Sequence, residues 1–283
     1  MFSKSVNVTS GSVRSIAFLV CVYKNDNYQH FYEMLDSLQA LDIPQGFDSR
    51  LYLHVDGVLD VQFIDLINRV SPFKLLISEE PVGLARGLNK LISILSDEDY
   101  FFRMDSDDLC HPSRIIQQLT FMDANPDIDF CGGAISEFIG TKKNQVTIRT
   151  YPRDDDSIRR QLVKGSPFAH VSICFRASFF SQYGNYPVEY PLNEDIAFWF
   201  QALKGGAKGA NLNTILVYVR MDSAYSRRTY RKAITEFRVY REVARWSGKS
   251  LFYPLSRLIF RLLPVYVVKG IYNSKFRRLF LNK

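Results

Sequence analysis

The chain has 283 residues, of which 47% are hydrophobic and 23% are charged, as in an ordinary globular protein of one or two domains. With 15 glycines and 11 prolines, its composition excludes collagen-like and low-complexity proteins. Residues 224–283 contain 15 Lys and Arg residues and 2 acidic residues, whereas residues 1–223 contain 21 basic and 27 acidic residues. A mildly acidic body therefore precedes a strongly basic tail.

The cysteines give a first indication of the compartment. They follow no pair pattern and stand at Cys21, Cys110, Cys131 and Cys174. We interpret them as reduced thiols of a cytosolic protein. The polar residues 1–15 lack the apolar core of a secretory signal, and no stretch has the ~18 apolar residues of a membrane span. We therefore expect a cytoplasmic protein.

The first hundred residues alternate between strand and helix patterns. Short, continuous apolar runs predict buried strands at 16–22, 51–55, 74–77 and 100–104. Apolar residues at helical spacing predict helices at 31–41, at 63–70 and from the loop at Gly83 to about Leu95. This alternation indicates an α/β fold with a Rossmann-like, mostly parallel central sheet flanked by helices. Ligands of such sheets bind outside the carboxyl ends of the strands.

The pattern continues less regularly after Pro112. A helix is predicted from there to about Asn125, and strands are predicted at 129–135, 172–176 and 215–219. A further helix is predicted at 193–204, because Asn193, Glu194 and Asp195 favour a helix N-terminus. We expect three regions: a polar segment over 1–14, a globular domain over 15–222 and a basic amphipathic helical region over 223–283.

The basic tail has two interpretations. Residues 230–245 place apolar side chains on one helical face and basic ones around the other, and residues 251–272 form a second apolar and basic segment that Pro254 and Pro264 interrupt. Such a region suits a membrane surface better than a membrane span. It also suits a pair of helices that pack on the body with a solvated basic face.

The most informative stretch is Arg103-Met104-Asp105-Ser106-Asp107-Asp108, directly after the fourth predicted strand. Three carboxylates in four residues repel one another, and a cation relieves that repulsion. Asp105 and Asp107 are two residues apart, so an extended backbone points both the same way. Hard divalent cations prefer such oxygen ligands. A solvated acidic turn is the plainer alternative.

Several motifs then occur in a fixed order along the chain. They are Val22-Tyr23-Lys24, Val55-Asp56-Gly57, Gly83-Leu84-Ala85-Arg86-Gly87-Leu88-Asn89, the segment 103–108, and Asn193-Glu194-Asp195 with Trp199 a turn later. Together they span residues 15 to about 206 and resemble glycosyltransferase family 2, of the type that builds bacterial surface polysaccharides such as O-antigen, capsule and exopolysaccharide. The resemblance implies a GT-A catalytic domain over 15–222 and leaves the basic tail outside the shared core.

The resemblance also implies a nucleotide-diphosphate sugar donor, most commonly a UDP-sugar, a divalent metal (Mn²⁺ or Mg²⁺) and inversion at the anomeric carbon. It makes Asp107 the direct metal ligand and places Asp105 against the ribose or the metal shell. Asp56 would bind the nucleobase and Tyr23 would stack near it. Arg86 would contact uracil or the diphosphate.

On the acceptor side, the resemblance makes Asp195 the general base. The sugar or acceptor pocket would involve Glu194, Asp108 and His170, the last within Pro167-Phe168-Ala169-His170-Val171-Ser172. Asp108 could instead orient its loop, and His170 could be a structural residue of its own loop. Trp199 would be either a wall beside a sugar or a core aromatic residue, and Glu194-Asp195 could simply cap a helix.

This set of residues is chemically sufficient for sugar transfer. One carboxylate takes the proton of the acceptor hydroxyl, and a metal neutralises the departing diphosphate, which then needs no proton. The basic tail favours a lipid-linked saccharide acceptor on undecaprenyl diphosphate, at the cytoplasmic face of the bacterial membrane.

Two alternatives stay open. A nucleotidyltransferase or another nucleotide-sugar enzyme of related fold would carry a glycine-rich loop after the first strand, whereas residues 23–27 contain no glycine. A nucleic-acid-binding protein is suggested by the basic tail alone, and the acidic body offers no matching groove. We therefore expect no nucleic-acid partner.

Overall fold

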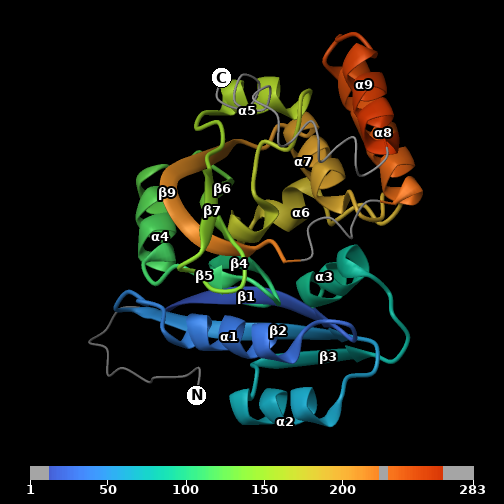
Figure 1. Cartoon of the computed structure of the whole chain (residues 1–283). Coiled ribbons are helices and arrows are strands. Elements are labelled where there is room, and N and C mark those ends of the chain that lie inside the picture. The colour runs from blue at the N-terminus through green and yellow to red at the C-terminus, as the bar shows by residue number, and fades with distance from the viewer. Residues whose placement is uncertain (1–12, 223–228, 264–283) are drawn as a thin grey trace.

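A computed structural model describes residues 13–222 and 229–263 of the chain. Within them, nine strands form one mixed sheet with helices on both faces, which confirms the α/β class (Figure 1). The strands are β1 (Arg14–Tyr23), β2 (Phe47–Asp56), β3 (Lys74–Ser78), β4 (Tyr100–Asp105), β5 (Leu109–Cys110), β6 (Phe130–Phe138), β7 (Gln145–Arg149), β8 (Cys174–Arg176) and β9 (Gly209–Arg220). Their order in the sheet is β3-β2-β1-β4-β8-β6-β9-β5, and β7 pairs with β6.

The first four strands are parallel and end at a common edge. In their register, Tyr23 of β1 lies beside Asp56 of β2, which lies beside Ser78 of β3. On the other side of β1, Cys21 lies beside Asp105 of β4. The carboxyl ends of these strands therefore gather the polar residues that the sequence places after its apolar runs.

The second half of the sheet is mixed. The short strand β8 is antiparallel to both β4 and β6, whereas β6 and β9 are parallel. The strand predicted at 172–176 is shorter in the structure, because a 3₁₀ turn over His170–Ser172 precedes β8. The hairpin of β6 and β7 adds a further antiparallel pair at this end of the sheet.

Helices cover both faces of the sheet and bury two hydrophobic cores. One core includes residues of α1 (Tyr28–Gln39), α2 (Val61–Val70) and α4 (Arg114–Ala124). The other includes residues of α3 (Leu84–Ile92), α5 (Asp155–Leu162), α6 (Phe179–Tyr183), α7 (Glu194–Lys204) and α8 (Tyr230–Trp246). This second core lies under the predicted acceptor side of the site.

The basic tail contains α8 and α9 (Phe252–Leu262), which pack against each other (Figure 1). Val239, Tyr240 and Val243 of α8 are buried in the same core as Phe198 of α7. Pro254 does not interrupt α9, because it lies in the first turn, where backbone amides have no helical partner.

Parts of the predicted terminal segments lie outside the described residues, namely 1–12, 223–228 and 264–283. In the described part of the chain, none of the helices is both long and apolar enough to cross a membrane.

Candidate active site

A cavity of about 230 Å³ opens at the carboxyl end of β4. It is lined by Asp105, Asp107, Asp108, Ile135, Arg149, Tyr151, Ser166, Phe168, Ala169, His170, Val171, Asp195, Val219 and Arg220. The structure therefore brings the acidic segment after β4 and the first turn of α7 to one cavity, although about ninety residues separate them in the sequence. We call it the central pocket.

The carboxylates of the acidic segment 105–108 differ in their exposure and contacts. Asp105 stands at the end of β4 with its side chain 38% exposed, and it forms an ion pair with the buried guanidinium of Arg103. Asp107 also lines the central pocket. Asp108 is almost fully buried, and its Oδ1 accepts a hydrogen bond of 2.8 Å from the backbone amide of Arg220. Asp108 therefore ties the segment to the end of β9, in agreement with the loop-orienting alternative.

Asp195 enters the central pocket from the first turn of α7. Burial raises the pKa of Asp195 above the ordinary value, while the backbone amide of Ile196 and the ammonium of Lys232 oppose that rise. Burial, together with the charge of Asp195, also raises the pKa of Glu194. A carboxylate of raised pKa in a cavity has the properties of a general base. Glu194 is not among the residues that line the central pocket, so its predicted acceptor contact stays a prediction.

His170 also lines the pocket and is held in place by its neighbour. Its Nε2 lies 2.8 Å from the hydroxyl of Tyr186. Burial, with a smaller effect from the positive charge of Arg103, lowers the pKa of His170 to about 3. The imidazole is therefore neutral near pH 7, and it can exchange hydrogen bonds with a substrate without adding a positive charge.

Of the residues predicted to bind the nucleotide, Asp105 lines this pocket, whereas Tyr23, Asp56 and Arg86 are not among its lining residues. Tyr23 ends β1 and is partly exposed, and Arg86 is exposed in the first turn of α3. The carboxylate of Asp56 is buried and accepts hydrogen bonds from the backbone amides of Val82 (2.7 Å) and Gly83 (2.9 Å). Asp56 thus fixes the loop that leads to Arg86, and its contact with a nucleobase stays a prediction.

The structure corrects one alternative for Trp199. Its ring is fully buried and stacks on Phe130 with centroids 5.5 Å apart, and it also packs against Phe168 and Phe175. Trp199 lies about one turn beyond Asp195 on α7, and its ring is packed in the core and is not part of the pocket lining. Trp199 is therefore a core residue and not a wall beside a sugar.

Known proteins resemble this chain over most of its length. The sequence profile described as Glycosyl transferase family 2 matches residues 22–184. The chain is 30% identical to an uncharacterized glycosyltransferase of Haemophilus influenzae, over 92% of this chain and 98% of that protein. The chain belongs to glycosyltransferase family 2. It is thus a glycosyltransferase, which decides against the nucleotidyltransferase alternative.

Two further relatives of this family 2 glycosyltransferase have more specific names. The amylovoran biosynthesis glycosyltransferase AmsE of Erwinia amylovora is 26% identical, over 90% of this chain and 97% of its own. The UDP-Gal:alpha-D-GlcNAc-diphosphoundecaprenol beta-1,3-galactosyltransferase of Escherichia coli is 29% identical, over 76% of this chain and 79% of its own.

Solved structures confirm the GT-A fold. The structure of Staphylococcus aureus TarS residues 1–349 in complex with UDP-GlcNAc superposes with a TM-score of 0.60 at 14% identity, over 93% of this chain and 74% of that one. A longer TarS chain superposes with a TM-score of 0.57 at 15% identity, and this glycosyltransferase spans 44% of its length. At this identity the likeness concerns the fold alone.

Several residues that line the central pocket are not predicted from the sequence. Arg149 is the last residue of β7, and Tyr151 follows that strand by two residues. The guanidinium of Arg149 forms an ion pair of 3.0 Å with Glu137 of β6. Arg220 ends β9 and forms an ion pair of 2.6 Å with Glu33 of α1. No local motif marks these positions, since only the pairing of β6 with β7 and β9 brings them to the site. Polar residues in otherwise strand-like runs are the only sequence signal that could have found them.

The carboxylate oxygens in the central pocket of this family 2 glycosyltransferase suit a hard divalent cation. Asp105 and Asp107 offer carboxylate oxygens to one cavity. Over residues 13–222 and 229–263, no group of three or more His, Cys, Asp or Glu side chains is arranged to hold a metal ion. Mg²⁺ is commonly held by one or two carboxylates, together with water and substrate phosphates. Two protein carboxylates therefore fit such an ion once a diphosphate supplies the remaining ligands.

Proposed function

We propose that this protein is an inverting glycosyltransferase of bacterial polysaccharide biosynthesis. It would move a hexose or N-acetylhexosamine from a UDP-sugar to a saccharide linked to undecaprenyl diphosphate. One observation carries the proposal: Asp195 shares a single pocket with Asp105 and Asp107. The name of the Escherichia coli relative, which includes both a UDP-sugar and a diphosphoundecaprenol acceptor, supports this choice of substrates.

In this proposal, Asp195 removes the proton of the acceptor hydroxyl as that oxygen attacks the anomeric carbon. The partly buried carboxylate is suited to this step because its pKa is raised toward the working pH. The attacking oxygen and the departing diphosphate lie on opposite faces of the sugar, so the configuration at the anomeric carbon inverts.

On the donor side, Asp105 and Asp107 would hold Mn²⁺ or Mg²⁺, which supplies charge neutralisation for the departing diphosphate. The buried guanidinium of Arg103 orients Asp105 through their ion pair. Tyr23, Asp56 and Arg86 would bind the nucleotide beside this pair. Neutral His170 would donate or accept a hydrogen bond on the sugar or acceptor side.

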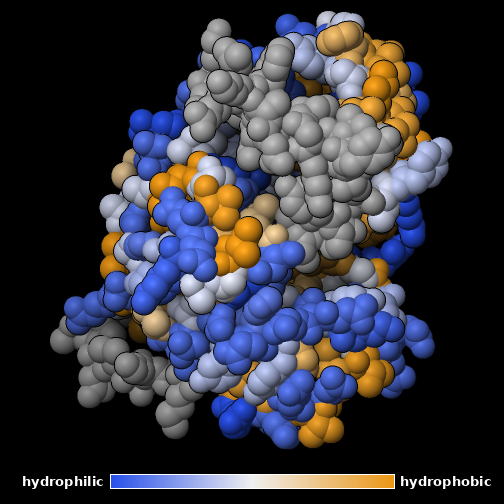
Figure 2. All heavy atoms as spheres, in the orientation of Figure 1, coloured by the Kyte–Doolittle hydropathy of each residue, from blue (hydrophilic) through white to orange (hydrophobic). Residues whose placement is uncertain are grey.

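The C-terminal helices would hold the enzyme at the inner face of the membrane, where its lipid-linked acceptor lies. Six apolar side chains of α9 and its preceding turn are exposed: Leu251, Phe252, Tyr253, Leu255, Ile259 and Leu262. Figure 2 shows this apolar surface along the outer side of the α8 and α9 hairpin. Apolar side chains that enter the headgroup region, with basic residues nearby for anionic lipids, would provide reversible binding.

The test is a transfer assay on the purified full chain. UDP-Glc, UDP-Gal, UDP-GlcNAc and UDP-GalNAc would each be mixed with Mn²⁺ and a synthetic lipid-diphosphate GlcNAc acceptor, and the products would be read by mass spectrometry. We expect one donor to give a product larger by one sugar, with the anomeric configuration inverted by NMR. Retention of configuration, or a sugar transfer that Asp195→Asn leaves unchanged, would contradict the proposal.

A further inference from the structure

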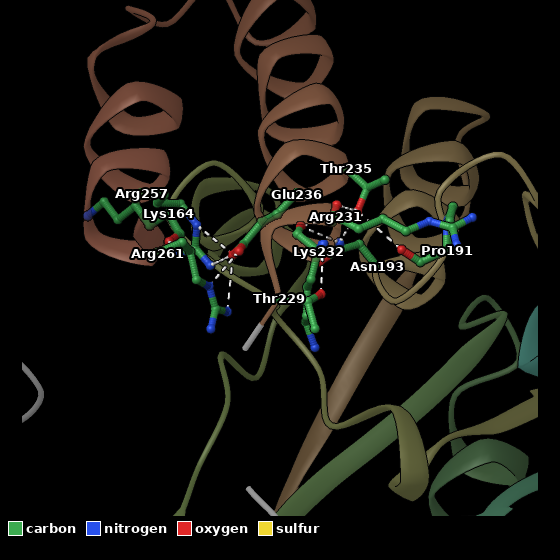
Figure 3. Close-up of polar contacts among 10 residues, drawn as sticks. All are labelled: Lys164, Pro191, Asn193, Thr229, Arg231, Lys232, Thr235, Glu236, Arg257 and Arg261. Carbon is green, nitrogen blue, oxygen red and sulfur yellow. Dashed lines mark hydrogen bonds and ion pairs between the residues drawn. The ribbon is translucent and has the colours of Figure 1, made fainter. Parts of the chain in front are cut away.

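The turn before α7 is held by α8 instead of by a cap of α7 itself. Asn193 is the N-cap residue of α7, but its side chain makes no capping hydrogen bond there. Its Nδ2 donates instead to the backbone carbonyl of Lys232 at 3.0 Å and to Oγ1 of Thr235 at 2.7 Å (Figure 3). The hydroxyl of Thr235 lies 3.1 Å from three carbonyl oxygens, those of Arg231 and Lys232 in its own helix and that of Pro191 at the start of the same turn. Thr235 thus contacts both ends of the turn.

This turn has an unfavourable backbone conformation. Leu192 lies between Pro191 and Asn193 and has a φ of 68°, in the left-handed region that non-glycine residues rarely adopt. Such a conformation is strained and persists only where the surrounding structure holds it. The Leu192 side chain is 48% exposed, so its own burial offers little compensation. The turn is held by a backbone hydrogen bond of 3.0 Å from the amide of Asn193 to the carbonyl oxygen of Tyr190 and by the side-chain contacts with α8.

These contacts are buried and lie directly before the predicted base. Asn193 and Thr235 are both almost fully buried. Removing either side chain would leave a buried polar group of the other without its hydrogen-bond partner and out of reach of water. Asp195 follows Asn193 by two residues and faces the central pocket from the first turn of α7. A change in the turn would therefore move the Asp195 carboxylate.

A buried ion cluster holds α8 itself in place. Glu236, the residue after Thr235, is buried and accepts hydrogen bonds from Arg257 (3.1 Å from Nε) and from Arg261 (2.6 Å) of α9. Arg257 also donates to the backbone carbonyl of Lys164, beyond the end of α5, at 2.8 Å. Thr235 and Glu236 are consecutive residues of α8, and Figure 3 shows their contacts on the two sides of that helix. The helix that supports the turn is thus fixed from its other side.

We propose that Thr235 and Asn193 are positioning residues that set the place of the Asp195 carboxylate in the central pocket. The inference rests on the proposed role of Asp195 as the base. It makes α8, which lies outside the part matched by the family profile, a component of the active site.

The first test compares a substitution that removes the hydroxyl of Thr235 with one that keeps it. Thr235→Val removes the hydroxyl and keeps the branched shape, whereas Thr235→Ser keeps the hydroxyl. We expect Thr235→Val to lower kcat about 10- to 100-fold, because a displacement of about 1 Å at a reacting group has effects of that order. The KM for the donor should stay within twofold, since the donor residues lie on other elements. Thr235→Ser should retain most of kcat, and Asn193→Ala should behave like Thr235→Val.

The control is Val243→Ala, which creates a cavity in the buried face of α8 away from the turn. It should lower Tm and leave kcat at 20 °C close to that of the wild type. If Val243→Ala lowers kcat as much as Thr235→Val at equal loss of Tm, Thr235 has only a structural role and the proposal is overturned. An unchanged kcat in Thr235→Val overturns it as well.

A second measurement does not depend on activity. Hydrogen–deuterium exchange of the peptide covering residues 190–197 should become faster in Thr235→Val and stay at the wild-type rate in Thr235→Ser. Unchanged exchange in Thr235→Val would contradict the positioning role. If the wild-type enzyme transfers no sugar, the proposed function fails, and the exchange comparison still shows whether Thr235 holds the turn.

Discussion

The backbone amide of Gly83 donates a hydrogen bond of 2.9 Å to Oδ2 of Asp56, and this contact joins the end of β2 to the start of α3. Gly83 has a φ of 86°, which places its amide toward the carboxylate and suits glycine above other residues. The other carboxylate oxygen accepts from the amide of Val82. Asp56 therefore holds the loop before Arg86 with both of its oxygens.

The first prediction concerns this contact. Asp56→Ala leaves two backbone amides without their charged acceptor, so we expect unfolding to require about 1.5–3 kcal/mol less free energy. UDP binding should also weaken, because the loop before Arg86 is released. Urea denaturation and calorimetric titration with UDP measure the two effects. The matched control is Asp65→Ala on the exposed side of α2, for which both should stay unchanged.

The second prediction concerns the base and its dependence on pH. Asp195→Asn should lower kcat by about 10²- to 10⁴-fold and leave the dissociation constant of UDP unchanged. In the wild type, the base form is lost as pH falls through the raised pKa of Asp195. The acid limb of kcat/KM should therefore have its midpoint above the ordinary carboxyl value of about 4. A midpoint at or below that value would contradict the assignment.

The same pKa shift predicts an effect on stability. A carboxyl whose pKa is raised by folding favours the folded state below its unfolded pKa, and that contribution is lost as pH rises through the folded value. At pH 7.5 the ionised Asp195 therefore destabilises the fold, and the neutral amide of Asp195→Asn should raise Tm. The increase should shrink as the pH is lowered. Asp195→Asn also removes the charge that helps to raise the pKa of Glu194, so the gain in Tm reports the relief of both buried carboxyls.

The third prediction concerns the carboxylate pair. Asp107→Ala should reduce the affinity for UDP in the presence of Mn²⁺ to the value measured with EDTA. Asp107 supplies one of the two protein carboxylates available to the ion, and the diphosphate would bind through that ion. Titrations of UDP with and without Mn²⁺ measure this difference. Equal gains of affinity from Mn²⁺ in the wild type and in Asp107→Ala would remove Asp107 as a ligand.

The fourth prediction separates the core from the pocket. Trp199→Phe should reduce the free energy of unfolding by about 1–3 kcal/mol, because it leaves a space among Phe130, Phe168 and Phe175. The KM values for donor and acceptor should stay unchanged, since the ring is fully buried and His170, against which it packs, stands between it and the pocket. A large rise of either KM at full stability would restore Trp199 as a sugar-binding residue.

The fifth prediction concerns the membrane. Phe252 and Ile259 are the most exposed apolar residues of α9, so the double substitution Phe252→Glu with Ile259→Glu should abolish sedimentation with anionic liposomes and keep Tm. Deleting residues 250–283 is a poorer test, because it removes Arg257 and Arg261 from the buried Glu236. Unchanged sedimentation of the double variant would exclude α9 as the membrane contact.

The sequence was sufficient to predict the parallel part of the sheet and the acidic segment. The runs at 16–22 and 100–104 are short, continuous and apolar, and they match β1 and β4 closely because buried parallel strands need no alternation. Arg149 and Tyr151 could not be predicted as pocket residues, since long-range pairing of β6 and β7 places them there. Trp199 was ambiguous, because residues four apart on a helix share a face and its spacing from Asp195 favoured the pocket, whereas long-range packing with Phe130 and Phe175 buries the ring in the core.

The register between β1 and β4 limits where residues can be inserted or deleted in this protein. Cys21 lies beside Asp105 in adjacent parallel strands, and successive side chains of a strand alternate between its faces. A single codon gained or lost within residues 100–105 would exchange the faces of the side chains that follow in β4 and turn Asp105, a proposed cation ligand, away from the central pocket. Length changes among homologues should therefore occur in the connection between β6 and β7, residues 139–144, and never inside β4.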